Sequence, residues 1–260
     1  MIPASLYQTI YLTLVTIMTL IVYSQYQSRN GLREFALSRT DALVGVLVIF
    51  LILFIGLRPV SASFVDMLNY VLYYEVLYDG ATFVLDWDSE NKIFDNLFAW
   101  WGAVRLGYTS FFVFVAAIYF AGAYLGIRKL FPNHRLTAYL VFLAAFSTFS
   151  YGTNGIKAGA ATSLFIWALG YRENLKVCIP LVLLSWGFHH SMIMVVVAFV
   201  ITLFVKNPKY YFWVWGFCFL MAAAHVTAFA HLFAGATTEH GAGYLLGTGG
   251  GGMELEVGFV

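Results

Sequence analysis

Long apolar runs separated by short charged gaps constrain this chain more than any other feature. The runs cover residues 7–23, 42–57, 110–127, 136–150, 158–171, 177–205 and 210–232. Most approach the roughly 20 residues with which a helix crosses a hydrocarbon layer of about 30 Å. Lipid allows only helices or closed barrels, and the alternation typical of barrel strands is absent. The sequence therefore predicts an all-α, polytopic helical membrane protein with about seven to eight transmembrane segments.

Composition agrees with this class. Hydrophobic residues make up 61% of the 260 residues and charged residues only 10%, whereas about a quarter of the residues in soluble domains are charged. We expect one helical transmembrane domain over residues 1–234. We expect residues 235–260 to form a Gly-rich external tail, and from the abrupt end after Val260 we expect a truncated chain. Residues 1–23 lack a basic start and a small-residue cleavage site, so we expect an uncleaved first span.

The charges predict an orientation. Ten of the fourteen Lys and Arg residues lie in four gaps: Arg29, Arg33, Arg39, Arg128, Lys129, Arg135, Arg172, Lys176, Lys206 and Lys209. Ten of the thirteen acids lie in the other gaps: Asp66, Glu75, Asp79, Asp86, Asp88, Glu90, Asp95, Glu239, Glu254 and Glu256. Basic loops favour the cytoplasm, so we expect the acidic gaps and the N-terminus outside.

The run 177–205 has basic residues at both ends, which the orientation rule places on the same side. Its one break, residues 187–191, leaves two arms that are each short for a full crossing. We predict a broken hairpin whose tip carries His189 and His190 in the outer half of the membrane, beside a cavity. The alternative is one long tilted helix in which the two histidines pack against neighbours.

Other polar residues are predicted to reach the same outer level. Arg58 ends the second run before Pro59, and Asp66 is its nearest candidate partner. Asp66 also opens residues 64–78, which we expect to form an external amphipathic segment. Its polar residues recur at spacings compatible with one broad helical face: Asn69, Tyr70, Tyr73, Tyr74 and Tyr78. The alternative for the tyrosines is an aromatic belt at the membrane interface.

Lys157 lies at the expected first turn of the helix that follows Asn154 and Gly155. A cation at a helix N-terminus opposes the helix dipole, so an anion should compensate it. Asp66 or a phosphate could supply that charge.

The order of these residues resembles the EpsG family of exopolysaccharide biosynthesis membrane proteins, which are similar in turn to Wzy-type polymerases. The similarity spans about residues 45–205. Where the family usually has Arg, this chain has Lys157, which keeps the charge but loses the planar fork that grips phosphate oxygens in pairs. The residues that carry the resemblance are Gly56-Leu57-Arg58, Asp66 with Tyr70, Glu90, Asn154-Gly155-Ile156-Lys157 and Phe188-His189-His190-Ser191.

The resemblance implies a polysaccharide polymerase, a membrane glycosyltransferase that joins undecaprenyl-diphosphate-linked oligosaccharide repeat units for exopolysaccharide, capsule or O-antigen. It also implies the bacterial inner membrane, an active cavity that faces the periplasm, and other polysaccharide assembly proteins as partners besides the lipid bilayer. The expected roles are as follows: His189, His190 and Asp66 catalytic; Arg58 and Lys157 at the diphosphate; Tyr70, Tyr73, Asn154 and Glu90 at the sugars.

No cofactor, metal or nucleic acid is expected. Four C-terminal residues have no zinc-site spacing: His225, His231, Glu239 and His240. Cys178 and Cys218 lie in apolar runs and predict no disulfide. Other functions remain open, namely a transporter or flippase for a lipid-linked or anionic substrate, a membrane acyltransferase, and a structural subunit of a glycan assembly complex. A transporter would show a path to both faces, whereas the polymerase would show polar side chains converging on one outward cavity.

Overall fold

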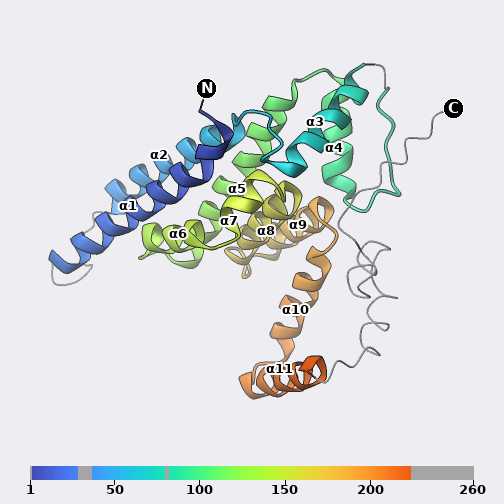
Figure 1. Cartoon of the computed structure of the whole chain (residues 1–260). Helices are drawn as coiled ribbons and strands as arrows, with labels where there is room; N and C mark the ends of the chain where they lie inside the picture. The colour runs from blue at the N-terminus through green and yellow to red at the C-terminus, as the bar shows by residue number, and fades with distance from the viewer. Residues whose placement is uncertain (1, 29–36, 80–81, 224–260) are drawn as a thin grey trace. The chain divides into compact units, whose positions relative to one another are not determined.

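The structure is a computed structural model that describes residues 2–28, 37–79 and 82–223. Every regular element in these residues is helical, which confirms the predicted all-α fold. The predicted tail 235–260 lies outside the described residues, as do His225, His231, Glu239 and His240. The elements are η1 (Ala4–Leu6), α1 (Tyr7–Ser28), α2 (Leu37–Gly56), α3 (Val65–Tyr78), α4 (Lys92–Ala103), α5 (Tyr108–Leu130), α6 (Arg135–Ala144), α7 (Thr148–Thr153), α8 (Ile156–Leu169), α9 (Leu175–Phe188), α10 (Met192–Phe204) and α11 (Pro208–Ala223) (Figure 1).

The chain divides into two compact units, and the single transmembrane domain expected over residues 1–234 stays a prediction. The first unit is Met1–Val197, and the second is Ala198–Val260. The second unit contains the end of α10 and all of α11 among its described residues. The predicted site residues all lie in the first unit.

Two described helices, Ala4–Ser24 and Tyr108–Leu130, are long and apolar enough to cross a membrane. Five more are apolar but shorter: Ala42–Gly56, Arg135–Ala144, Ile156–Leu169, Leu175–Phe188 and Met192–Phe204. These helices overlap the predicted apolar runs, two of which are divided, and the number of spans stays a prediction.

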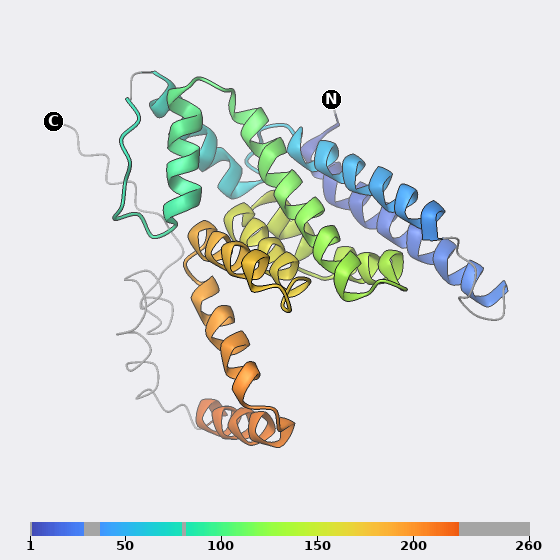
Figure 2. The ribbon, with the colours of Figure 1, turned by 180° about the vertical axis from the view of Figure 1, so that it is seen from behind.

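Helices α5, α8 and α9 form the centre of the first unit (Figure 2). Helices α5 and α8 run in the same direction, because Gly122 lies against Ser163 and, one turn later, Gly126 lies against Ile166. A Cβ at Gly126 would overlap the Ile166 carbonyl, so this glycine permits the close approach of the two backbones. Helix α9 also packs on α8, where the Ser185 hydroxyl donates to the Ala161 carbonyl at 2.7 Å.

The predicted run 136–150 is not one helix. It divides into α6 and α7, with Ala145 in an extended conformation between them. Thr148 compensates for the lost helical bonds, because its Oγ1 donates to the Phe142 carbonyl at 2.6 Å. Its own carbonyl accepts a hydrogen bond from the Tyr119 hydroxyl at 3.1 Å. Polar side chains therefore bond the backbone carbonyls at the break between α6 and α7, and the apolar pattern of the sequence does not reveal this break.

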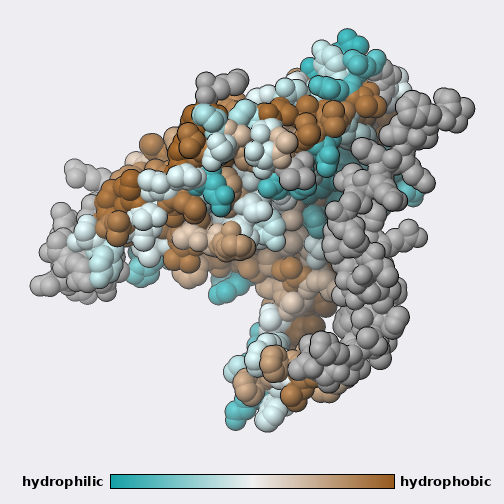
Figure 3. Space-filling view, viewed as in Figure 1, coloured by the Kyte–Doolittle hydropathy of each residue, from teal (hydrophilic) through white to brown (hydrophobic). Residues whose placement is uncertain are grey.

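Apolar side chains cover the outer faces of α1 and α2. Val46 is 68% exposed, and Ile17, Leu20 and Ile49 are also exposed. Figure 3 shows hydrophobic surface along the visible face of these two helices. A contiguous apolar surface of this kind is costly in water and suits contact with lipid tails.

Helices α3 and α4 pack against each other beside the start of α5. Helix α3 confirms a helical segment over residues 64–78, and Tyr70, Tyr73 and Tyr74 lie on one broad face of it, because all three rings contact Phe98 of α4. Tyr74 is buried on this face, whereas Tyr73 at its edge is 54% exposed. The more clearly amphipathic helix is α4, which buries Phe94, Phe98 and Gly102 at intervals of four residues.

The predicted break in the run 177–205 is confirmed. Helix α9 ends at Phe188 and α10 begins at Met192, so the alternative of one long tilted helix is wrong. Gly187 holds the end of α9 against Ile93 of α4, where a Cβ would overlap the isoleucine side chain. Packing of α9 and α10 as a tight hairpin stays a prediction, because α10 continues into the second unit.

Candidate functional site

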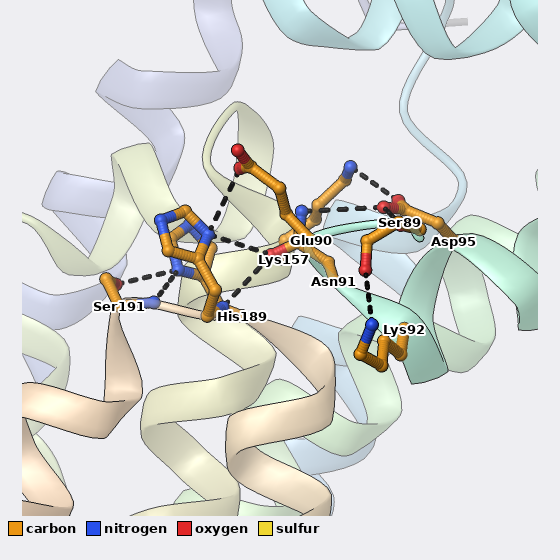
Figure 4. Close-up of polar contacts among 9 residues, drawn as sticks. Ser89, Glu90, Asn91, Lys92, Asp95, Lys157, His189 and Ser191 are labelled. Carbon is orange, nitrogen blue, oxygen red and sulfur yellow. Dashed lines mark hydrogen bonds and ion pairs between the residues drawn. The ribbon is translucent and has the colours of Figure 1, made fainter. Parts of the chain in front are cut away.

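Charged residues from three parts of the first unit meet beside the N-terminus of α8 (Figure 4). Lys157 is the second residue of α8, Asp95 lies in the first turn of α4, and His189 follows the end of α9. The Lys157 ammonium donates to Asp95 Oδ1 at 2.6 Å, with the two side chains 24% and 32% exposed. The anion predicted for Lys157 is therefore present, but it is Asp95 rather than Asp66.

Aromatic rings bound the Lys157 ammonium on other sides. Its Nζ lies 5.7 Å from the centroid of the Tyr70 ring and 5.3 Å from that of the Phe94 ring. Ring faces attract a cation but accept its N–H bonds only weakly. An ammonium has three donors, so the pair with Asp95 leaves donor capacity at a partly exposed position.

The loop before α4 fixes the orientation of Asp95. The Ser89 hydroxyl donates to Asp95 Oδ2 at 2.6 Å, so the other oxygen, Oδ1, faces Lys157. Asp86 Oδ1 in turn accepts the backbone N–H groups of Asp88 and Ser89 at 2.8 and 3.2 Å. Asn96 of α4 bonds both backbone groups of Asp86. These bonds order a polar loop that has no regular secondary structure.

Asn91 connects this loop to the histidines. It is the N-cap residue of α4, yet its side chain does not cap that helix. Its Oδ1 instead accepts the backbone N–H of His190 at 3.1 Å. The His190 ring Nδ1 lies 3.4 Å from the same oxygen and 3.5 Å from Glu90 Oε2. Three consecutive residues of the loop thus make these contacts: Ser89 bonds Asp95 of the Lys157 pair, and Glu90 and Asn91 contact His190 at the break between α9 and α10.

His189 stacks on His190, with ring centroids 5.1 Å apart, and its Nδ1 lies 2.7 Å from Ser191 Oγ. When Nδ1 donates to that hydroxyl, Nε2 is free to accept a proton. The Ser191 backbone N–H, 3.3 Å from Nδ1, stabilises the other tautomer. The pKa of His189 is lowered, first by burial and then by the positive charges of His190 and Lys157, against opposing effects of Asp95 and Glu90.

Arg58 is 4% exposed and lies apart from this cluster. Its guanidinium donates to the carbonyls of Ile55 and Thr153, both at 2.8 Å, and lies 5.6 and 5.1 Å from the ring centroids of Phe64 and Phe112. The predicted pairing with Asp66 is wrong: in the described part of the chain, Arg58 has no carboxylate partner. The carbonyls at the ends of α2 and α7 take its donors instead.

The structure thus brings together five of the predicted residues, namely Lys157, His189, His190, Glu90 and Tyr70. Tyr73 stacks on Phe98 and is 54% exposed, and Asp66 lies half-buried in the first turn of α3. Asn154 has a buried Oδ1 without a hydrogen-bond partner, one residue after the carbonyl that Arg58 binds. Neither Asp66 nor Asn154 forms a hydrogen bond with the cluster among the described residues.

Sequence reasoning missed Ser89, Asn91 and the role of Asp95. Asp95 appeared only as one of many outward acids. The recurrence of Phe94, Phe98 and Gly102 could have identified α4 and its buried face. Asp95, next to Phe94, would then have been expected close to that face rather than in open solvent.

An all-helical fold with apolar outer faces and a polar cluster at the ends of apolar helices defines the class of helical membrane proteins. Within this class the chain belongs to the EpsG family, whose model matches residues 41–245. It is therefore a membrane protein of polysaccharide biosynthesis. Comparisons with curated proteins and with solved structures gave no match.

Proposed function

We propose that this chain is a membrane glycosyltransferase that polymerises undecaprenyl-diphosphate-linked oligosaccharide repeat units on the outer side of the bacterial inner membrane. The observation that carries the proposal is the cluster in which Lys157, held by Asp95, shares one network with the two histidines of the α9–α10 break. The network combines an imidazole with a cation that, among the described residues, uses one of its three donors, and both lie at the ends of apolar helices.

The transfer needs both groups. The bond between the anomeric carbon of the growing glycan and its diphosphate breaks, and a bond from that carbon to a hydroxyl of the next repeat unit forms. The leaving diphosphate keeps the electron pair and gains charge, which the Lys157 ammonium stabilises. The acceptor hydroxyl loses its proton to a base, for which His189 is the candidate because burial and nearby cations favour its neutral form.

The remaining predicted residues take supporting roles. Arg58 is buried against Phe112, so in this proposal it holds the segment before Lys157 and does not contact the diphosphate. Glu90 and His190 orient the acceptor near His189, and the exposed side chain of Tyr73 stacks on a sugar ring. Asp66, Tyr70 and Asn154 bind the glycan where it passes α3 and the start of α8.

A complementation experiment tests the proposal. In a strain that has lost its own copy of the protein, Lys157→Ala and His189→Ala should each abolish long polymer and leave single repeat units on the lipid carrier. Lys176→Ala and His134→Ala are matched controls, because both side chains are exposed and lie outside the cluster. Both controls should keep the wild-type distribution of glycan lengths at equal protein level.

Wild-type polymer from both cluster variants would contradict the proposal. A transporter makes a different prediction, because its loss would trap the lipid-linked units on the cytoplasmic leaflet. Accumulated units should instead be open to glycosidases added to the outer face. Protection of those units in the variant strains would favour transport over polymerisation.

A further inference from the structure

The proposed reaction requires the Lys157 ammonium at the diphosphate, but Asp95 already accepts one of its hydrogen bonds. Its Oδ1 lies 2.6 Å from the Lys157 ammonium. Its second oxygen accepts the Ser89 hydroxyl at 2.6 Å, and Asn91 Nδ2 lies 3.5 Å from the same oxygen. The loop therefore holds this carboxylate toward the lysine, and the contact is built into the fold.

The surroundings of the Lys157 ammonium show why the Asp95 carboxylate matters for anion binding. The ammonium rests against the rings of Tyr70 and Phe94, and its side chain remains 24% exposed. An unpaired cation there would attract any anionic group at the membrane surface. A bilayer offers phosphodiester headgroups with a single negative charge in large excess over any lipid-linked sugar.

Charge decides which anion can compete with Asp95. A phosphodiester that replaces the carboxylate exchanges one negative charge for another and also has to be desolvated, so it gains little. A diphosphate carries more than one negative charge and several acceptor oxygens, which match the donors that Asp95 leaves free. The carboxylate thus lowers the affinity for every anion, but a diphosphate retains enough attraction to bind.

We infer that Asp95 is an internal competitor for Lys157 that makes this site select a lipid diphosphate over singly charged phospholipid headgroups. The inference rests on the proposed function, because it takes the Lys157 site to be the diphosphate site. It assigns to Asp95 a role in selectivity and not in the bond-breaking step. Ser89 and Asn91 support that role by holding the carboxylate in place.

Binding of undecaprenyl diphosphate to the full chain in lipid nanodiscs tests the inference. Native mass spectrometry gives the affinity in discs of neutral phosphatidylcholine and in discs that also contain phosphatidylglycerol. In neutral discs, Asp95→Asn should bind undecaprenyl diphosphate about tenfold tighter than wild type, because the competing charge is gone. Phosphatidylglycerol should then weaken binding to Asp95→Asn strongly and to wild type only slightly.

Asp95→Glu keeps the charge and is the matched control, so it should behave as wild type. Equal or weaker binding by Asp95→Asn in neutral discs would overturn the inference. The unaltered chain gives a second test that needs no folded variant: phosphatidylglycerol that competes fully with undecaprenyl diphosphate on wild type would also overturn it. Lys157→Gln separates the proposed function from the role of Asp95. If wild type binds undecaprenyl diphosphate no better than Lys157→Gln, then Lys157 does not form the diphosphate site at all.

Discussion

At the scale of single residues, this chain places a cation where helix electrostatics oppose it. Lys157 is the second residue of α8, at the positive end of the helix dipole. Asp95 compensates from the first turn of α4, where the same effect favours an acid. Each helix start thus contributes one partner of the pair. The unfavourable interaction of Lys157 with the α8 dipole is tolerated because Asp95 of α4 neutralises it. A local rule that is broken and compensated elsewhere is typical of functional sites.

The pH dependence of activity should report on His189. Its pKa lies below the ordinary value of about 6.5, so the neutral form that accepts a proton persists to lower pH, and activity should fall only as the pH drops through that lowered pKa. His190→Gln removes a charge that lowers this pKa and should move the acid limb to higher pH. Glu90→Gln removes a charge that raises it and should move the limb to lower pH.

The measurement is the initial rate of polymer formation in membranes at a series of pH values. Shifts of the two variants in opposite directions would identify His189 as the titrating group, since His190 and Glu90 act on its pKa with opposite sign. Shifts in the same direction, or an unmoved acid limb, would point to a different base.

Sequence patterns were sufficient for the residues that stand out from an apolar background. Lys157 directly precedes one apolar run, and His189 and His190 interrupt another, so their meeting at one level could be predicted, while Glu90 entered through the family resemblance. Asp95 was not predicted as a partner, because six other acids of the first unit share the outward gaps. The choice of Asp95 over Asp66 depends on how α3 and α4 turn relative to α8, which is a tertiary property that no local pattern contains.

At the scale of elements, close contact between helix backbones determines the centre of the first unit. Gly126 of α5 lies directly on α8, where a larger residue would separate the helices, and Gly122 one turn earlier lies beside Ser163. Arg58 joins elements in another way, because one guanidinium binds the carbonyl ends of both α2 and α7. From its charge and its place before Pro59, the sequence predicted that Arg58 contacts the substrate. Its burial and its hydrogen bonds to two backbone carbonyls depend on tertiary structure and could not be predicted from charge.

Gly126→Ala should destabilise the chain by about 2 kcal/mol, because the added methyl overlaps the backbone of Ile166 and the helices have to move apart. Gly45→Ala is the matched control: it replaces a helical glycine with nothing within 4 Å of the new Cβ. The control should leave stability unchanged or raise it by about 0.5 kcal/mol. Thermal unfolding of both variants in detergent gives the comparison. Equal midpoints would contradict the close packing of α5 on α8.

Arg58→Ala should cost about 3 kcal/mol, because the Thr153 carbonyl loses the guanidinium donor and the Ile55 carbonyl keeps only the longer bond from the backbone N–H of residue 58. Arg105→Ala is the control, since Arg105 is exposed and contacts only the ring of Tyr78 among the interactions described. Its loss should change the unfolding midpoint little. A normal midpoint for Arg58→Ala together with lost binding of undecaprenyl diphosphate would instead restore the expectation that Arg58 contacts the diphosphate.

At the scale of the whole molecule, the first unit separates its charges by end. Lys129 at the end of α5 lies 5.1 Å from the ring centroid of Tyr171, which follows α8, so two basic gaps predicted to be cytoplasmic lie side by side. The cluster of Asp95, Glu90 and Lys157 lies at the opposite end of α8. The apolar runs and their charged gaps were sufficient to predict this polarity. They could not predict the break at Ala145, which depends on side-chain bonds to freed carbonyls.

The polarity makes a labelling prediction for the membrane orientation. Cysteines introduced as Asp88→Cys and Ser191→Cys should react with a membrane-impermeant maleimide added to intact spheroplasts, because both positions are exposed at the acidic end. Lys129→Cys and Arg172→Cys are exposed at the basic end and should react only after the membrane is permeabilised. The background is Cys218→Ala, since Cys218 is exposed whereas Cys178 is buried.

Labelling of Lys129→Cys in intact spheroplasts would reverse the orientation and place the cluster in the cytoplasm, where a periplasmic polymerase could not work. Labelling of Asp88→Cys and Ser191→Cys alone would put the Lys157 pair and the histidines on the side where the proposed transfer has to occur.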